Sequence, residues 1–372
     1  MSDLVSDPPV SRPPDGEEGP LETAVLFVDL VASSEFASVL GLKEYAEYVD
    51  SFEQLCREQC TYFFEKFQKK QNWSRGRDYD WQFVGDELVV FLHTDNPRQN
   101  IYQLLALAIT LKCGWLGTKL NAHRLEAGAP SAELAAGIHI GNVWARFDPR
   151  TGYKKRGFAI NVAKRIESAS RDGQHFRIYV SDPAMKRVNR LMRNVIFSQR
   201  MMLPMKGVVV PIGVYEVVDS FLNPYMRLEE KLFEGFRSVA YKALGANSYD
   251  LWIHSCIQVS EEARNNSLVT DHHYDLCRRT LSIDRSNASA LYHAAQATCK
   301  RLDCQTARLY LESLTGFWPG FGDGWLESGR VLKSLGDIPA AERALLQARR
   351  CGIPVEEESL PSETGTIAGS PP

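Results

Sequence analysis

Two aspartates follow apolar, strand-like segments and are the first residues whose positions suggest chemistry. Asp29 follows "TAVLFV", and Asp86 follows "QFVG" on a Gly-Asp turn. A carboxylate at the end of a buried strand is costly unless something compensates its charge. If the two strands are neighbours, both carboxylates meet at one edge of the sheet, and two Mg²⁺ or Mn²⁺ ions would satisfy them. Paired divalent ions suit in-line displacement at phosphorus; two unrelated turn aspartates are the plain alternative.

The segment after Asp29 has the composition of a phosphate-binding turn. "ASSE" leads from the apolar strand into a helix, and we expect Ser33 or Ser34 to be the helix N-cap. Unpaired N–H groups and the helix dipole attract anions at such a terminus. Because any capped helix offers these groups, the segment supports phosphate binding only together with the two aspartates.

The elements that must position these residues predict an α+β domain around one central sheet. Residues 79–93 indicate a β-hairpin that turns at Gly85-Asp86. Residues 132–147 suggest a pair of strands around Gly141. Further strands are expected at 23–30, 176–182, and within "NVIFSQRMM" and "IGVYEVV"; helices are expected at 41–70, 98–120, 158–170 and shortly after 182.

After Asn223-Pro224 the sequence shows only helical patterns, up to about residue 354. Leu291 and Trp325 lie 34 residues apart, as do Ala307 and Ala341. The unit "WLESGRVLKSLGDIPAAERALLQARRCGIP" resembles a tetratricopeptide repeat, and a plain helical bundle is the alternative. We therefore expect four parts, namely a disordered tail (1–20), the α+β domain (21–222), an all-α tetratricopeptide-like regulatory region (225–354) and a second disordered tail (355–372).

Composition limits the class of protein. The chain has 372 residues and a formal net charge of −3, which gives no sign of a nucleic-acid partner. The N-terminus does not read as a signal peptide, and the longest apolar stretch, at 101–111, is too short to cross a bilayer. The eight cysteines include no C-x-x-C motif. We expect a soluble cytosolic protein without membrane insertion and without disulfides.

Five segments, taken together, resemble the catalytic domain of class III nucleotide cyclases. "VLFVDLVASSEF" and "FVGDELVVF" resemble the two metal-aspartate motifs, and "GIHIGNV" resembles the strand segment that follows them. "RGFAINVAKRIES" resembles the family's helix with an Asn and, one turn later, an Arg, and "MKGVVVPIGVYEV" resembles its closing Lys-Gly segment. The five motifs occur in the family's order over residues 24–218, which makes their joint occurrence specific.

The resemblance implies a ferredoxin-like α+β domain, with a mostly antiparallel sheet, that works as a head-to-tail homodimer with composite active sites. Asp29, Asp86 and the carbonyl of Leu30 would hold two divalent ions in one protomer. The partner protomer would supply an Asn161 that orients the ribose and an Arg165 that stabilises the transferring phosphoryl group. Lys206 would reach the β- and γ-phosphates, and Ser33 and Ser34 would also bind the substrate.

Two positions read the base in this family, and neither matches a purine pattern here. Adenylyl cyclases carry Lys and then Asp or Thr, and guanylyl cyclases carry Glu and a small polar residue; this chain has Gln82 and Lys154. Gln82 can donate and accept, whereas Lys154 only donates, which suits the O2, N3–H and O4 edge of uracil. Cytosine is an alternative, with Lys154 reaching O2 or N3. Tyr153 or Arg156 could replace Lys154 if the loop shifts.

These departures make the chain similar to Pycsar-type pyrimidine cyclases. That similarity implies conversion of UTP to cyclic UMP and pyrophosphate during bacterial antiphage defence, with the product read by a separate effector protein. Synthesis of cyclic CMP or cyclic AMP remains an alternative. A different class of function is an inactive cyclase-like dimer that acts as a binding module through its repeats.

Overall fold

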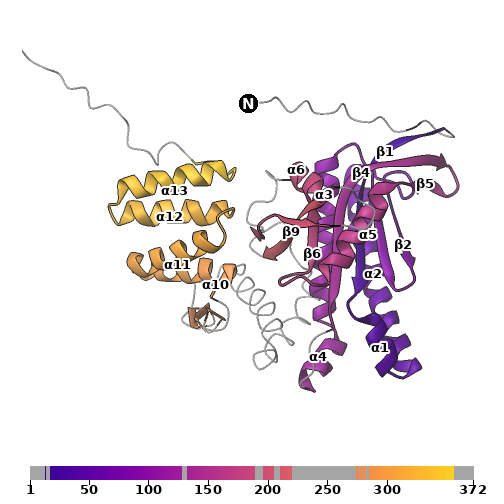
Figure 1. Ribbon diagram of the computed structural model, residues 1–372, viewed down its shortest axis with the longest axis horizontal. Coiled ribbons are helices and arrows are strands. Elements are labelled where there is room, and N and C mark those ends of the chain that lie inside the picture. Colours follow the sequence, from indigo (N-terminus) through magenta and orange to yellow (C-terminus); the bar gives the residue numbers. More distant parts are fainter. Residues whose placement is uncertain are drawn as a thin grey trace, which may run out of the picture.

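A computed structural model of the protein describes residues 13, 17–127, 132–188, 196–204, 210–219, 274–275, 277–278, 280–281 and 285–355 (Figure 1). Lys206 lies outside the described residues, as do both chain ends and most of the segment predicted to be helical between 225 and 284. The predictions for these parts therefore stay predictions.

Within the described residues, nine strands form one sheet, whose main order is β2-β3-β1-β4-β6-β9-β7. Every pairing is antiparallel except that of β4 with β6. This confirms an α+β domain with a mostly antiparallel central sheet. The strands are β1 (Glu18–Leu30), β2 (Tyr79–Val84), β3 (Glu87–Leu92), β4 (Leu134–Asp148), β5 (Gly152–Arg156), β6 (Ile178–Ser181), β7 (Ile196–Phe197), β8 (Met201–Leu203) and β9 (Ile212–Asp219).

The two faces of β1 carry different neighbours, because alternate side chains of a strand point to opposite faces. Leu26 and Val28 belong to the main core under α2 (Leu42–Gln71) and α3 (Pro97–Leu116). Val25 and Phe27 pack instead with Ala163 of α5 (Phe158–Ser170). Asp29 continues this second row, so its carboxylate lies on the face of the sheet that α5 covers (Figure 1).

Helix α5 lies very close to strand β4, and Gly137 permits the approach. A Cβ atom at Gly137 would lie 2.2 Å from the amide nitrogen of Glu167 and 2.6 Å from the carbonyl oxygen of Ala163. Both are backbone atoms of α5, so no side-chain rotation could relieve the clash. The glycine therefore fixes the height of α5 above the sheet.

Gly137→Ala is expected to lower the free energy of unfolding by about 1–3 kcal/mol, the usual cost of overpacking a core. The matched control is Gly141→Ala on the same strand, where the added Cβ would lie 3.1 Å from the side chain of Ala159. Urea unfolding of both variants measures the difference. An equal loss in the two variants would show that the backbone contact at Gly137 is not decisive.

Strands β4 and β1 are both longer than the sequence predicted. Residues 132–147 were expected to form two strands around Gly141, but β4 runs without interruption from Leu134 to Asp148. The reason is its long pairing with β1, which continues in one register from Glu18↔Arg146 to Leu30↔Leu134. The same pairing starts β1 at Glu18, five residues before the strand predicted at 23–30 and inside the stretch expected to be a tail.

The described part of the C-terminal region consists of helices that stack on one another (Figure 1). The helix α12 (Gly322–Ser334) begins 34 residues after α10 (Ala288–Lys300), and α13 (Ile338–Arg350) begins 34 after α11 (Cys304–Phe317). Gly329 faces the side chain of Leu345, so a small residue permits close helix packing. The helix spacing agrees with the period of the sequence, while the tetratricopeptide arrangement itself stays a prediction.

The helical region touches the α+β domain through an aromatic contact. The Trp318 ring lies edge-on to His175, with 5.5 Å between ring centres. Trp318 also donates its indole N–H to the Ser286 carbonyl at 2.6 Å, which fixes the ring. None of the helices in the described ranges is both long and apolar enough to cross a membrane.

Candidate active site

The antiparallel pairing of β1 and β3 brings the two predicted metal aspartates to one end of the sheet. Asp29 pairs directly with Glu87, and Asp86 precedes Glu87 in the β2–β3 turn. Gly85 opens this turn with a φ of 67°, in the left-handed region that glycine adopts without strain. Burial raises the pKa of Asp29, and the Asp86 charge adds to this rise, so the two carboxylates lie within electrostatic reach.

Both carboxylate oxygens of Asp29 accept hydrogen bonds. The side chain is only 6% exposed. The Leu30 amide donates to Oδ1 at 2.8 Å, and Lys164 Nζ lies 3.4 Å from Oδ2. The Arg171 guanidinium donates to the same Oδ2. The partner that the buried charge of Asp29 requires is therefore a pair of cations from α5 and its C-terminal end.

Glu87 and Glu167 complete a buried carboxylate cluster with Asp29. One oxygen of each lies within 4.8 Å of the others. Lys164 Nζ lies 2.5 Å from Glu87 and 2.7 Å from Glu167, and Arg171 Nε lies 2.9 Å from Glu167. Burial raises the pKa of Asp29, and burial raises that of Glu87 to about 7, while the nearby cations act against both shifts.

Sequence reasoning did not single out Glu87, Lys164, Glu167 or Arg171. The last three recur at intervals of three and four residues, which places them on one face of a helix. That spacing could have shown that they act together. It could not show that this face lies over Asp29, because the contact depends on how α5 packs on the sheet.

The oxygen donors at this end of the sheet fit hard divalent cations. Asp29 and Asp86 supply carboxylates of the kind that Mg²⁺ and Mn²⁺ prefer, and the Leu30 carbonyl lies next to them in the chain. Asp86 is half-buried and has no hydrogen bond or ion pair to other residues in the described part of the chain. Oδ2 of Asp29 accepts from both Lys164 and Arg171 and could coordinate a metal only if they leave, whereas Oδ1 accepts from the Leu30 amide alone.

The N-cap of the helix that follows Asp29 is not the residue expected from the sequence. The short helix α1 spans Ser33–Val39, but its N-cap is Ala32, and no side chain caps it. The prediction that Ser33 or Ser34 is the N-cap is therefore wrong; these are the first two residues of the helix itself. Ala32 has a φ of 62°, a left-handed conformation that costs a residue with a Cβ about 1 kcal/mol or more.

Asn161 and Arg165 lie one turn apart on α5. Asn161 is exposed and Arg165 is half-buried. Neither makes a hydrogen bond or an ion pair with the carboxylates of the cluster in the described ranges. One protomer therefore does not bring its own Asn161 and Arg165 to its own Asp29.

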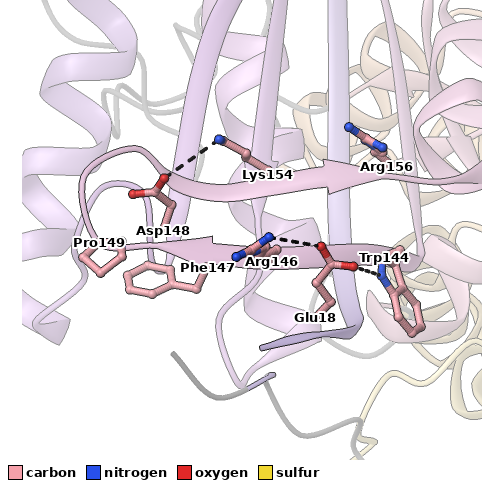
Figure 2. Close-up of a pocket in the computed structure, with 8 residues that line it drawn as sticks. All are labelled: Glu18, Trp144, Arg146, Phe147, Asp148, Pro149, Lys154 and Arg156. Carbon is pink, nitrogen blue, oxygen red and sulfur yellow. Dashed lines mark hydrogen bonds and ion pairs between the residues drawn. The ribbon is translucent and has the colours of Figure 1, made fainter. Parts of the chain in front are cut away.

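The two base-reading candidates lie on different faces. Gln82 is exposed on β2 and pairs with Val89, on the face that α5 covers. Lys154 lines a pocket of about 520 Å³ on the outer face of the β4–β5 ribbon (Figure 2). There it pairs with Asp148 at 3.9 Å, and Trp144, Arg146 and Arg156 line the same pocket.

Lys155, the next residue, lies on the face that carries Gln82. Its Nζ lies 4.8 Å from the centre of the Phe91 ring and 3.9 Å from the Asp80 carboxylate. Burial lowers the Lys155 pKa to about 8. In the described part of the chain the structure does not bring Gln82 and Lys154 together.

No protein-family model matches the chain, and no curated protein sequence matches it. Solved structures do resemble it. The adenylyl cyclase CyaB from P. aeruginosa aligns with a TM-score of 0.43 and 20% identity, over 55% of this chain and 97% of that one. The guanylyl cyclase Cya2 gives 0.41 and 18%, over 55% and 93%. A dimeric guanylyl cyclase domain of the RhoGC fusion protein from Blastocladiella emersonii gives 0.34 and 13%, over 54% and 97%.

Proposed function

We propose that the protein is a metal-dependent nucleotide cyclase that converts a nucleoside triphosphate, preferably UTP, into its 3′,5′-cyclic monophosphate and pyrophosphate. One observation carries the proposal. Asp29 and Asp86 meet at one end of β1 and β3, beside the helix that bears Asn161 and Arg165. Buried carboxylates at a sheet end suit divalent-ion chemistry better than a structural role, which apolar residues would fill at lower cost.

In this reaction the ribose 3′-oxygen attacks the α-phosphorus of the same nucleotide, and pyrophosphate leaves. Divalent ions held by Asp29, Asp86 and the Leu30 carbonyl would make the hydroxyl more acidic and neutralise the triphosphate. Asn161 would orient the ribose by hydrogen bonding. The Arg165 guanidinium would face the charge that develops on the transferred phosphoryl group.

The triphosphate would be held by residues near the start and near the end of the α+β domain. Lys206 is assigned to the β- and γ-phosphates by resemblance alone, since it lies outside the described residues. Ser33 and Ser34 begin α1 directly after β1, so their backbone N–H groups lie near the metal aspartate in the chain. The loss of the expected side-chain cap leaves their hydroxyls available for phosphate oxygens.

The active form would be a homodimer in which each site combines the metal residues of one protomer with Asn161 and Arg165 of the other. Exposed apolar side chains next to both halves of the site support this arrangement. Val84, two residues before Asp86, is 56% exposed, and Phe158, three residues before Asn161, is also 56% exposed. In the proposed dimer the partner would cover these two side chains.

UTP is proposed as the preferred substrate because the positions that read purines in the cyclases hold Gln82 and Lys154 here. Cyclic CMP or cyclic AMP synthesis is the alternative. The outward position of Lys154 means that Gln82 is the better-supported contact to the base. A site built around one base edge rejects the others strongly, since the wrong base leaves polar groups unpaired.

Incubation of the protein with each of the four NTPs and Mn²⁺, followed by identification of the product, tests the proposal. We expect cyclic UMP, with kcat/KM for UTP at least about tenfold above that for ATP, a difference of about 1.4 kcal/mol. In the variant Gln82→Lys, which carries the adenylyl cyclase residue at the position on the face that α5 covers, the ratio should move towards ATP. ATP as the best substrate of the unaltered protein would overturn the base assignment but not the cyclase assignment.

A second candidate is a domain without catalysis that dimerises and presents its helices to a partner. The occupied oxygens of Asp29 and the outward position of Lys154 favour it. This candidate predicts no pyrophosphate release above background with any NTP.

If the protein is instead the proposed cyclase, its resemblance to Pycsar-type cyclases implies that it supplies a cyclic nucleotide to a separate effector in antiphage defence. Residues 225–354 would then be regulatory.

A further inference from the structure

We propose that Lys164 and Arg171 form a counter-ion clamp that holds Oδ2 of Asp29 in the metal-free protein and must leave this oxygen before it can coordinate a divalent ion. The clamp rests on the proposed function, because it concerns the metal site of that enzyme. It adds a regulatory contact made by two residues to which the resemblance assigns no role.

The contacts of Asp29 oppose metal binding as they stand. Lys164 and Arg171 both bind Oδ2, and the Leu30 amide binds Oδ1. Both lone pairs of Oδ2 are engaged and Oδ1 keeps one beside the Leu30 amide, so a metal ion could neither take Oδ2 nor bind the carboxylate through both oxygens while the cations stay. It would also meet two positive charges within a few ångströms, where burial strengthens repulsion.

Release of the clamp is feasible because each cation has a second partner. Lys164 keeps Glu87 at 2.5 Å and Glu167 at 2.7 Å, and Arg171 keeps Glu167 at 2.9 Å. Neither cation would be left buried without a counter-charge. Their side chains are 37% and 36% exposed, so both can move towards solvent, whereas Glu167 is fully buried and stays in place.

The charges of the cluster determine the sign of the expected effect. Asp29, Glu87 and Glu167 are three buried carboxylates, and the clamp supplies two cations. Removing one cation frees Oδ2 in part and leaves more negative charge for an external ion to neutralise. A residue that only supported Asp29 would have the opposite effect, because its loss would disorder the ligand and weaken metal binding.

Mn²⁺ titration of the full chain without nucleotide, followed by the EPR signal of free Mn²⁺, tests the clamp. Lys164→Met is expected to bind Mn²⁺ about two- to fivefold more tightly than the unaltered protein, since loss of a part-exposed ion pair changes an equilibrium by about that factor. The Mn²⁺-induced rise in Tm should be larger in the same variant. Lys186→Met, which removes an exposed lysine from α6 (Asp182–Val188), is the matched control and should change neither quantity.

Two further variants separate the outcomes. Arg171→Gln should tighten Mn²⁺ binding in the same direction, and adding Asp29→Asn to Lys164→Met should remove the gain if the ion binds at Asp29. Unchanged or weaker Mn²⁺ binding in folded Lys164→Met and Arg171→Gln would overturn the clamp. Absence of any Asp29-dependent Mn²⁺ binding in the unaltered protein would instead contradict the proposed function.

Discussion

Asp29→Ala and Asp86→Ala are each expected to abolish cyclisation while leaving the protein folded. Both carboxylates would be direct metal ligands, and even the loss of an outer partner of a ligand typically costs 10–100-fold, so we expect a loss of at least about 100-fold. The fold should survive because Lys164 and Arg171 keep Glu167 and Glu87 as partners after Asp29 is removed. Asp86 is half-buried in the β2–β3 turn and makes no ion pair within the described ranges.

Pyrophosphate release at saturating NTP and Mn²⁺ measures the effect, and circular dichroism and thermal unfolding establish that the variants are folded. Asp50→Ala removes an exposed carboxylate from α2 and serves as the control for a loss of negative charge. Either aspartate variant retaining activity close to that of Asp50→Ala would refute the assignment of two metal ligands.

Mixing two inactive variants is expected to restore activity. Asp29→Ala damages the metal half of a composite site, and Arg165→Ala damages the half that the other protomer provides. In a mixed dimer of the two, one site combines both defects and the other is whole. Random exchange of protomers at equal concentration makes half the dimers mixed, so we expect about a quarter of the unaltered activity in a symmetric dimer.

The pairing of Asp29→Ala with Asp86→Ala is the matched control. Both substitutions lie in the metal half, so every site in that mixed dimer is damaged and no activity should return. Proof that mixed dimers form, for example by pull-down of differently tagged protomers, is part of the experiment. Lack of recovery despite mixed dimers, or equal recovery in the control, would contradict sites shared between protomers.

Local patterns were enough to place most of the secondary structure around the site. The Gly85-Asp86 turn lies between β2 and β3, and the helix expected at 158–170 is α5 with the same bounds. Both depend on short-range rules, namely turn chemistry and the helical spacing of apolar residues. The long strand β4 escaped prediction because Gly141 suggested a turn, whereas pairing with β1 keeps it extended.

The contacts of the site were harder to predict because they depend on registers and packing. The five residues of β5 form a strand whose pairing with β4 decides whether Lys154 or Lys155 faces Gln82. A shift of one residue would exchange the two faces, and nothing in "YKKRG" fixes it locally. The ion pairs around Asp29 join β1, β3 and α5, so no single segment of sequence contains them.

The position of α5 gives the proposed dimer a mechanical property. Gly137 lets the helix lie against the backbone of β4. Lys164 of this helix binds Asp29 of its own protomer, while Asn161 and Arg165 of the same helix would serve the partner's substrate. A small rotation of this helix would therefore alter both active sites at once. It would change the metal half of one site through Lys164, and the half of the other site that Asn161 and Arg165 provide. In the proposed dimer, cooperativity between the two sites, seen as a Hill coefficient different from one for the metal or the nucleotide, would be the consequence of placing both sets of residues on one helix.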